Sequence, residues 1–537
     1  MGNSQPANVL IVGAGPSGLI LAHELLRRGV RVRLAEKRPQ PSHTTRAFTL
    51  HARTMEMFEH IGVAHRLEEV CLPCPGNIYH FQGMSEDQLP RTDFRALPSR
   101  YAFYYKLNQN DFEQVLREHL NAQYSLVPEY GTELVSVAER ADGVEVGLRH
   151  AEAGDVEHGR YDWVVGCDGS KSRVRQEAGI GFTGQRVGVM AMMDVEIEAF
   201  PYDGSWVNYF ISRDLFMLVT RLPGRYWRVY LSDAGAMTEA GNPRQSFQQV
   251  ADQIGIGMKI GEPQWATQWE ILNNIATRYR EGRVLLCGDA SHVHSPAGGQ
   301  GMNGCMQDAF NLGWKLAAVV NGLAEPEILD SYERERRPIG EQISAGAKAT
   351  HDIVMAFGTG LADRIKITQQ PEWQDNSIRL ISGLAHHYRE AVRIPPGLAP
   401  VPGPAPGERA PDALLTAEPR KRLFDLFRHP GFTLLASPGD GDRGQLSVIG
   451  QVFDEIRSRF PGLVATRLIS AAPAAGFDFD CNLLDTEGEF ADRYAIGASG
   501  RLVLVRPDMY IGLSTTLEDA GRLPEYLGYW FRADVCA

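Results

Sequence analysis

The sequence predicts an α/β fold in three parts: a Rossmann-type domain, an antiparallel-sheet domain inserted into it, and a small C-terminal α/β domain. Three observations predict this fold. A short apolar strand at residues 8–13 leads into the loop Gly13-Ala-Gly15-Pro-Ser-Gly18 and then into a helical stretch. From about 186 to 235, aromatic and β-branched residues alternate between turn signals, as in an antiparallel sheet. Seven prolines between Pro395 and Pro411 indicate a stiff, exposed linker before the last domain.

The boundaries follow these changes of pattern. The predicted parts are residues 1–185 for the first part of the Rossmann-type domain, with 76–102 contributing to the sheet domain, 186–277 for the sheet domain, 278–393 for the second part of the Rossmann-type domain and a helical region, 394–411 for the linker, and 412–537 for the C-terminal domain. Helices are predicted from the spacing of apolar residues at 52–70, 109–120, 302–320 and 331–356.

Length and composition exclude several classes of protein. A chain of 537 residues with 43% apolar and 22% charged residues predicts a globular protein of more than one domain. The net charge of -12 argues against a nucleic-acid-binding surface. No apolar run approaches the roughly 20 residues that span a bilayer, and no signal peptide is evident. Seven scattered cysteines suit a reducing compartment, so we expect a cytoplasmic location.

The glycine loop carries the strongest chemical signal. Gly13 permits a tight turn, Gly15 lets a pyrophosphate approach the backbone, and Gly18 allows a helix to pack closely on the sheet. Free N–H groups at the start of the helix would meet the phosphates. Glu36 ends the second strand, where a carboxylate binds a ribose 2′-OH and disfavours a 2′-phosphate. The alternative is a glycine-rich loop with a purely structural role.

A second motif follows the short apolar strand at 283–286, which leads into Gly288-Asp289. A carboxylate at the C-terminal end of a parallel strand is well placed to bind a hydroxylated chain such as ribityl. The loop from Pro296 to Asn303 comes next, and its glycines expose N–H groups at the start of a long helix, whose dipole adds roughly half a positive charge. The alternatives are a turn or cap for Gly-Asp and a flexible connector for the loop.

A third motif places Asp168 between a strand at 163–165 and a helix rich in basic residues. It is a candidate for cofactor binding. A local salt bridge or a helix N-cap is the alternative interpretation.

Together these motifs resemble the class A flavoprotein aromatic hydroxylases, which have the p-hydroxybenzoate hydroxylase fold. The segments from Asp308 to Leu316 and from Tyr332 to Pro338 match the helices that follow in that family, and the resemblance covers about 1 to 345. The C-terminal part is similar to the thioredoxin-like domain of phenol and polyketide hydroxylases, with Leu504 to Tyr510 as the matching signature. That part has no CxxC, and Cys481 stands alone, so we expect a structural or dimer-contact role rather than thiol redox chemistry.

The resemblance implies an FAD-dependent monooxygenase that uses NADPH or NADH as a transient reductant, and O2, to hydroxylate a phenolic or polycyclic aromatic substrate through a C4a-hydroperoxyflavin. The dimer-contact role of the C-terminal part makes a homodimer possible. We expect no metal, because Cys71-Leu-Pro-Cys74 has no second CxxC or HxxxH to complete a zinc site. The residues expected to bind FAD are Gly13, Gly15, Gly18, Glu36, Arg46, Gln109, Asp168, Asp289, Gly299, Gly301, Met302 and Asn303. Arg46, on the nicotinamide route, and Pro296, facing the isoalloxazine, are the catalytic candidates.

The substrate residues are predicted from the hairpin at 216–227, which resembles the sheet that covers the substrate side of the flavin in this family. Thr220, Arg225 and Trp227 are candidates, with Tyr209 on the neighbouring strand. Ordinary sheet packing and surface charge are the alternative for each of them. The many aromatic residues of this sheet favour a bulky polycyclic or extended phenolic substrate.

Other functions stay open at this point. A Baeyer–Villiger or epoxidising enzyme of the same fold would use the same motifs. A non-catalytic flavin-binding or interaction module would not need Asp289, Arg46 and the 296–303 loop together. An NAD-dependent dehydrogenase would leave the Gly288-Asp289 loop without a use. A flavin-dependent halogenase would need a Trp-x-Trp-x-Ile-Pro stretch, which the chain lacks.

Overall fold

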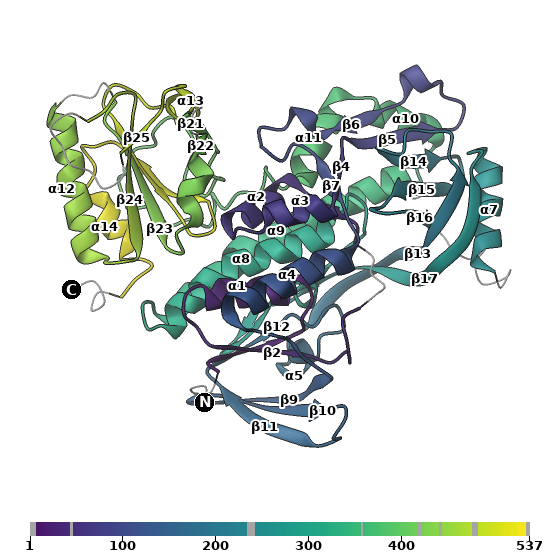
Figure 1. The fold of residues 1–537 in the computed structure, drawn as a ribbon, viewed down its shortest axis with the longest axis horizontal. Helices are drawn as coiled ribbons and strands as arrows, with labels where there is room; N and C mark the ends of the chain where they lie inside the picture. Colours follow the sequence, from purple (N-terminus) through teal and green to yellow (C-terminus); the bar gives the residue numbers. More distant parts are fainter. Residues whose placement is uncertain are drawn as a thin grey trace.

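The computed structural model describes residues 7–42, 47–232, 242–355, 358–416, 420–439, 443–474 and 482–532. Figure 1 shows the C-terminal domain to one side of a larger body, in which two long helices lie between two sheets. The mixed α/β architecture confirms the predicted fold class. Among the described residues, no helix is long and apolar enough to cross a membrane.

The Rossmann-type domain is built on a six-stranded sheet. In spatial order its strands are β18 (Arg280–Glu281), β19 (Val284–Leu286), β12 (Trp163–Gly166), β1 (Val9–Val12), β2 (Val32–Glu36) and β8 (Glu129–Tyr130). All neighbouring pairs run parallel except β18 and β19. The inner strands are short runs of Val, Leu and Ile that are fully buried, because helices and other strands cover both faces.

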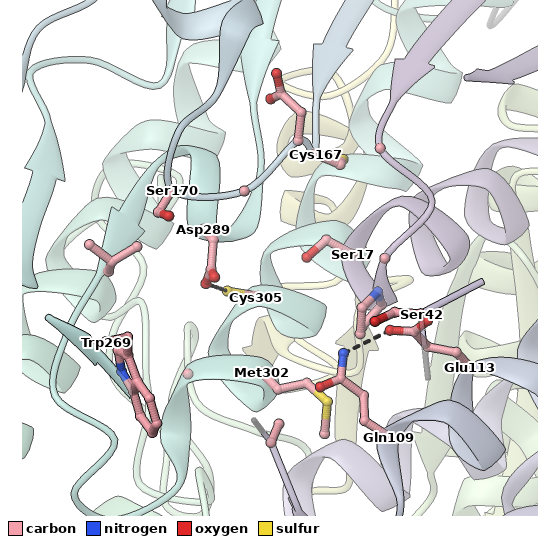
Figure 2. A pocket seen from close by; sticks show the side chains of 18 of the residues that line it. Ser17, Ser42, Gln109, Glu113, Cys167, Ser170, Trp269, Asp289, Met302 and Cys305 are labelled. Atoms are coloured by element: carbon pink, nitrogen blue, oxygen red, sulfur yellow. Dashed lines mark hydrogen bonds between the residues drawn. The ribbon is translucent and has the colours of Figure 1, made fainter. Parts of the chain in front are cut away.

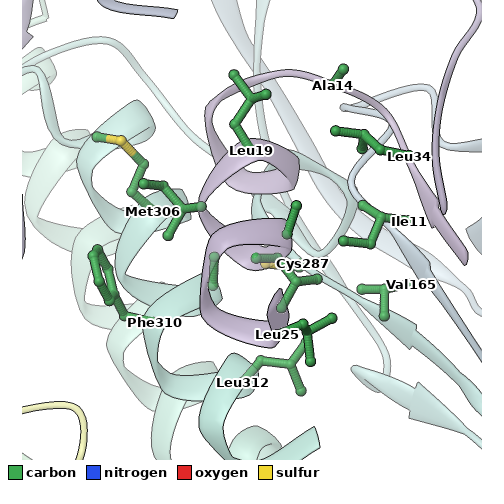
Figure 3. Close-up of a cluster of buried hydrophobic side chains, with 14 of the residues drawn as sticks. Ile11, Ala14, Leu19, Leu25, Leu34, Val165, Cys287, Met306, Phe310 and Leu312 are labelled. Atoms are coloured by element: carbon green, nitrogen blue, oxygen red, sulfur yellow. The ribbon is translucent and has the colours of Figure 1, made fainter. Parts of the chain in front are cut away.

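Two helices set the position of the cofactor loops. Helix α1 (Pro16–Leu26) lies between the sheet and the longer helix α8 (Gln300–Val320), and Figure 3 shows Leu19 and Leu25 of α1 in the apolar core that they share. The two helices touch closely at Gly313, where an added Cβ would lie 2.4 Å from the Cβ of Glu24. Glycine at this position therefore allows α8 to approach α1.

Several smaller elements surround this core. The segment predicted as one helix at 52–70 forms two, because Gly62 adopts a positive φ between them. The elements are α2 (Ala52–His60), α3 (Ala64–Val70), α4 (Gln109–Tyr124), the small sheet β3 (Thr49–Leu50), β7 (Tyr104–Lys106) and β4 (Leu72–Cys74), the sheet β9 (Thr132–Arg140), β10 (Gly143–His150) and β11 (Val156–Tyr161), and α5 (Arg173–Glu177).

The inserted domain is an eight-stranded, mostly antiparallel sheet. In spatial order its strands are β20 (His292–Val293), β17 (Lys259–Ala276), β13 (Phe182–Ala199), β16 (Trp227–Ser232), β15 (Phe216–Arg221), β14 (Val207–Ile211), β5 (Gly76–Phe81) and β6 (Arg91–Asp93). Strands β5 and β6, from the segment 76–102, extend this sheet, and β5 runs parallel to β14. Helix α7 (Pro243–Ile254) covers one face, and the opposite face packs against Ala297 of the loop before α8 and against Met355 and Ile381 of the helical region.

A helical region and the C-terminal domain complete the chain. The helices are α9 (Asp330–Thr350), followed by a π-helical turn at His351–Met355, α10 (Leu361–Thr368) and α11 (Pro371–Ile381). The last sheet has the order β25 (Asn482–Leu484), β24 (Val464–Ser470), β23 (Phe432–Ser437), β26 (Arg501–Val505) and β27 (Ile511–Thr515), flanked by α12 (Arg443–Arg459), α13 (Glu489–Arg493) and α14 (Arg522–Leu527), with the short pair β21 (Leu414–Thr416) and β22 (Lys421–Arg422).

The C-terminal domain is anchored to α8 and α9 by buried contacts. Trp314 of α8 packs in the apolar core of that domain, with its ring 5.0 Å from that of Trp530. Arg506 is buried and pairs with Glu335 of α9 and with Asp508, at 2.7 Å in each case. The segment predicted as an exposed linker is itself partly packed, since the amide of Gly407 donates to the carbonyl of Ile511.

Candidate functional site

A large cavity lies between the carboxyl edge of the parallel sheet, the first turn of α8 and the eight-stranded sheet (Figure 2). Its volume of about 560 Å³ falls within the range of roughly 300–1,000 Å³ that is usual for ligand pockets. The predicted cofactor and catalytic residues that line it are Gly13, Gly15, Glu36, Gln109, Asp168, Asp289, Pro296, Gly299, Gly301 and Met302. Gly18 and Asn303 do not line it, and Arg46 lies outside the described residues.

The three glycines of the first loop differ in what surrounds them. Gly13 has a φ of 104°, a value that L side chains rarely adopt, and its amide donates to the carbonyl of Ala35. An added Cβ at Gly18 would lie 1.9 Å from the carbonyl oxygen of Gly13, so this glycine allows α1 to pack against the loop. Around Gly15, no atom lies within 4 Å of an added Cβ. The open position therefore faces the cavity, where a phosphate could approach the backbone.

Glu36 lies at the far end of the cavity from the α8 loop. Its carboxylate accepts hydrogen bonds from the amides of Ala14 and Arg38, both at 2.9 Å, and from the Arg38 guanidinium. Burial acts to raise the pKa of Glu36, but these donors outweigh it and hold the pKa below the ordinary value. An ionised acceptor at this place suits a ribose hydroxyl.

Gln109 begins α4 beside Glu36 and donates to the carboxylate of Glu113 at 2.7 Å (Figure 2). Burial raises the pKa of Glu113, which also lines the cavity and was not predicted. The amide oxygen of Gln109 remains for a donor of the ligand.

Asp168 lines the cavity, but its carboxylate caps α5. The Ser172 hydroxyl donates to it at 2.5 Å, and the amides of Arg173 and Val174 donate at 2.7 and 3.1 Å. Ser172 is the N-cap residue of α5, and the Asp168 carboxylate supplements it by accepting from the first two amides of the helix, as the structural interpretation predicts. Burial raises the pKa of Asp168. Its contribution to a ligand is to shape the wall of the cavity rather than to supply a free carboxylate.

Asp289 follows β19 in a single 3-10 turn and is exposed to the cavity (Figure 2). The Cys305 thiol donates to its Oδ1 at 3.1 Å, and this side chain has no other hydrogen bond to the residues that the structure describes. Gly288 has a φ of 68°, and an added Cβ would lie 2.4 Å from the Ser17 hydroxyl. The turn therefore brings an available carboxylate next to the start of α1, as a hydroxylated chain would require.

The first turn of α8 forms the other end of the cavity. Gly298 and Gly299 both have positive φ, and an added Cβ at Gly299 would lie 2.6 Å from the Thr49 hydroxyl. Because the amides of a first helical turn have no partner within the helix, those at Gly301 and Met302 offer donors and a partial positive charge. An anionic or electron-rich ring edge would be stabilised there.

The side chain of Asn303 is occupied by contacts within the protein. Its amide donates to the carbonyls of Thr49 and Gly299, both at 3.0 Å, and its Oδ1 accepts from the amide of His51 at 3.0 Å. These bonds use the side chain to tie β3 to the first turn of α8, and the residue lies outside the cavity lining. Asn303 therefore braces the loop and does not contact a ligand with its side chain.

A smaller inner chamber lies next to the α8 loop. It shares Phe48, Thr49, Tyr230, Pro296 and Gly299 with the main cavity and encloses about 20 Å³ of space. The rest of its lining is apolar or uncharged: Asn77, Tyr104, Met190, Val207, Tyr209, Leu218, Gly298 and Met355. Of the residues that line the chamber, Tyr209, Pro296 and Gly299 were predicted, Tyr209 alone as a substrate residue. The others come from separate parts of the chain, and no local pattern links them.

The remaining substrate candidates lie elsewhere. Thr220 is buried on the same face as Leu218 but does not line the chamber. Arg225 and Trp227 were predicted to contact the substrate, but their side chains point away from the chamber. Arg225 has a side chain that is 71% exposed and pairs with Glu196 at 3.0 Å. The Trp227 ring packs 4.8 Å from Phe200, on the α7 side of the sheet, because side chains alternate between the two faces of a strand.

No group of three or more His, Cys, Asp or Glu side chains among the described residues is arranged to hold a metal ion.

Comparisons with known proteins agree with this geometry. A family described as "FAD binding domain" matches residues 6–347. The chain is 40% identical over 514 residues to pentachlorophenol 4-monooxygenase of Sphingobium chlorophenolicum, covering 95% of this chain and 94% of that protein. It is 35% identical over 399 residues to 6-methylpretetramide 4-monooxygenase of Streptomyces rimosus, covering 71% of this chain and 70% of that one.

Solved structures extend the similarity to the whole chain. Aklavinone-11 hydroxylase, solved with FAD and aklavinone, superposes with a TM-score of 0.77 at 26% identity and covers 99% of this chain and 100% of its own. Anhydrotetracycline hydroxylase from Streptomyces rimosus superposes with a TM-score of 0.76 at 29% identity and covers 98% of this chain and 99% of its own. The similarity thus includes the C-terminal domain.

Proposed function

The chain belongs to the FAD-dependent aromatic hydroxylases, and from this membership we propose that its substrate is a single-ring phenol bound in the inner chamber. The protein is a monooxygenase with FAD as its cofactor, and NAD(P)H is the reductant typical of the family. The family match and the relatives thus confirm the predicted enzyme class and the predicted cofactor. The identity of the substrate is the part that we propose.

The cavity fits FAD. The open backbone at Gly15 and the first turn of α1 suit the pyrophosphate, and Glu36 suits the ribose of the adenosine. The available carboxylate of Asp289 suits the ribityl chain, and the amides at Gly301 and Met302 suit the N1–C2=O edge of the ring. The chemistry that bound FAD supplies is the uptake of a hydride and the activation of O2.

The observation that carries the proposal is the position and nature of the inner chamber. It shares Pro296 and Gly299 with the expected site of the flavin ring, so a substrate there would be next to the reacting edge. Aromatic and methionine side chains make up much of its wall, and such a wall leaves little room for water beside the reacting edge of a flavin. No charged residue among the described residues lines it, so a benzoate would find no cation there.

The small size of the chamber favours the smallest aromatic substrates. Its volume of about 20 Å³ is close to that of one water molecule, so any aromatic ring requires its wall to repack. Met190 and Met355 belong to that wall, and methionine is a side chain that repacks readily. A single ring requires less repacking than a polycyclic one. The relative that is 40% identical over 95% of the chain is by its name active on a single-ring phenol. Polycyclic phenols, which the aromatic residues of the sheet also favour and on which other relatives act by their names, are the comparison class in the test.

The test is coupled turnover. Purified protein loaded with FAD is mixed with NADPH or NADH and a panel of phenols, benzoates and polycyclic phenols, and oxygenated product is measured against hydrogen peroxide. We expect single-ring phenols to accelerate NAD(P)H oxidation at least about tenfold and to give a ring-hydroxylated product. Efficient coupling with polycyclic phenols alone would contradict the proposal, and an ester or epoxide product would favour the Baeyer–Villiger or epoxidising alternative.

We also propose a homodimer, on the resemblance of the C-terminal domain to that of phenol hydroxylases. Light scattering after gel filtration would give about twice the chain mass of 59.4 kDa for a dimer and that mass for a monomer.

A further inference from the structure

Asn77 is the polar group in the wall of the inner chamber whose bonding is incomplete. It is 1% exposed, and its side-chain Oδ1 is buried without a hydrogen-bond partner among the described residues. A buried acceptor that has lost water and gained no donor is costly, so such an atom in a ligand chamber points to a donor that the ligand brings.

Three hydroxyl groups lie around the NH2 group of this amide. The Nδ2 of Asn77 donates to Thr92 Oγ1 at 2.9 Å, and the hydroxyls of Tyr79 and Tyr104 lie 3.3 and 3.5 Å from it. In the orientation that the structure has, the NH2 group faces these three hydroxyl oxygens as a donor. The carbonyl oxygen, on the other side of the amide, is the acceptor left without a donor among the described residues.

Tyr104 supplies the complementary donor. Its hydroxyl lies 3.5 Å from the Asn77 amide, and no acceptor for its own proton is found in the described part of the chain. Burial raises the pKa of Tyr104 well above its ordinary value, so the proton stays on the oxygen. Both Tyr104 and Asn77 line the chamber. A phenol hydroxyl both donates and accepts, whereas an ether or a carboxylate only accepts.

We propose that the side-chain carbonyl oxygen of Asn77 accepts a hydrogen bond from the phenolic hydroxyl of the substrate, and that Tyr104 donates to the same hydroxyl. Asn77 is then the residue that selects protonated phenols over phenyl ethers and benzoates. This inference rests on the proposed function, because it requires a phenol in the inner chamber. It adds the atom that recognises the phenol and the protonation state that is bound.

The experiment compares 4-methylphenol with 4-methylanisole on the FAD-loaded enzyme, with Kd measured from the change in flavin absorbance on titration. In the wild type we expect the phenol to bind at least about tenfold more tightly than its methyl ether, since a site built to bond a hydroxyl rejects the analogue that lacks one. Asn77→Leu should bring the two Kd values within about twofold, through weaker binding of the phenol. Tyr104→Phe should reduce the ratio in part.

Asn208→Leu is the matched control. Asn208 is a fully buried asparagine on the adjacent strand, on the opposite face of the same sheet, where its amide donates to the carbonyls of Asp203 and Trp206. This variant loses buried hydrogen bonds but should keep the wild-type preference for the phenol. Thermal unfolding of each holoenzyme shows which variants fold.

The outcomes separate the two proposals. If Asn77→Leu keeps the phenol preference, or if the wild type binds the ether as well as the phenol while still hydroxylating phenols, the role of Asn77 is overturned and the proposed function stands. If the wild type binds neither compound and no phenol stimulates NAD(P)H oxidation, the proposed function fails, and the role of Asn77 fails with it. Should Asn77→Leu not fold, the wild-type ratio and Tyr104→Phe decide.

Discussion

At the scale of single residues, the glycines of the first loop are needed for different reasons, because the space around their Cα atoms differs. Gly18 leaves no room, because an added Cβ would lie 1.9 Å from a backbone oxygen that has no freedom to move away. Gly15 leaves open space that a phosphate is expected to fill. The same substitution at the two positions should therefore separate stability of the apoprotein from affinity for FAD.

Gly15→Ala should change the free energy of unfolding of the apoprotein by less than about 1 kcal/mol, because the new methyl group meets no atom. It should still weaken FAD binding at least about tenfold, because the methyl group lies where the pyrophosphate approaches. Gly18→Ala should lower both stability, by about 3 kcal/mol, and FAD binding. Urea unfolding of apoprotein and fluorescence titration with FAD measure the two effects. Equal losses of stability would contradict this account.

At the scale of secondary-structure elements, sequence patterns predicted the parts that local rules govern. The strand–turn–helix unit, the long helix before Val320 and the alternating strands of the inserted sheet each have their own periodicity. Patterns could not show which face of a strand turns inward, and for that reason Trp227 was assigned to the wrong face. They also could not bring Asn77 and Met355 together, because only the assembled fold places β5 beside the end of the π-helical turn.

The brace between β3 and α8 gives a prediction at this scale. Asn303→Ala should weaken FAD binding about tenfold or more and lower stability by about 2–3 kcal/mol, because three backbone groups near Gly299 lose their partner. Asn321→Ala, at the exposed far end of the same helix, removes a bond to the Arg28 carbonyl and should cost less than about 1 kcal/mol with FAD affinity unchanged. Titration calorimetry with FAD distinguishes them. Unchanged affinity in Asn303→Ala would show that the loop needs no brace.

At the scale of the whole molecule, a buried ionic network joins the C-terminal domain to the rest. Lys315 and Arg506 share the carboxylate of Glu335, each at 2.7 Å, and Asn311 donates to both Glu335 and Asp508. Burial lowers the pKa of Lys315 to about 8, although Glu335 acts against this shift. Removing one member leaves opposite charges buried without compensation, which is the costly way to disturb such a network.

Arg506→Met should therefore destabilise the protein by about 3–5 kcal/mol, because the carboxylates of Glu335 and Asp508 lose their main partner. Arg522→Met, which breaks a partly exposed pair with Glu525, should cost less than about 1 kcal/mol. Urea unfolding followed by tryptophan fluorescence compares the two. Similar small losses would mean that the network adds little to the attachment of the domain.

Buried histidines predict how stability changes with pH. Burial lowers the pKa of His51 to about 4 and that of His386 to about 3, so both stay neutral in the folded protein. Between pH 6.5 and pH 5 the unfolded chain binds protons at these sites and the folded chain does not. The free energy of unfolding should thus fall as pH falls, by up to about 1.4 kcal/mol per pH unit for each histidine. Urea midpoints that stay constant from pH 7 to pH 5 would contradict this.

The position of Trp314 has a consequence for how the protein is made. This residue sits midway along α8, yet the rings that shelter it, those of Phe432 and Trp530, come from far downstream in the chain. Until the ribosome has synthesised those downstream residues, the side of α8 that carries Trp314 has no packing partner. The nascent chain therefore exposes an apolar surface on this helix. Although Figure 1 shows the C-terminal domain as a separate lobe, we expect the nascent chain to need chaperones until that domain has been synthesised.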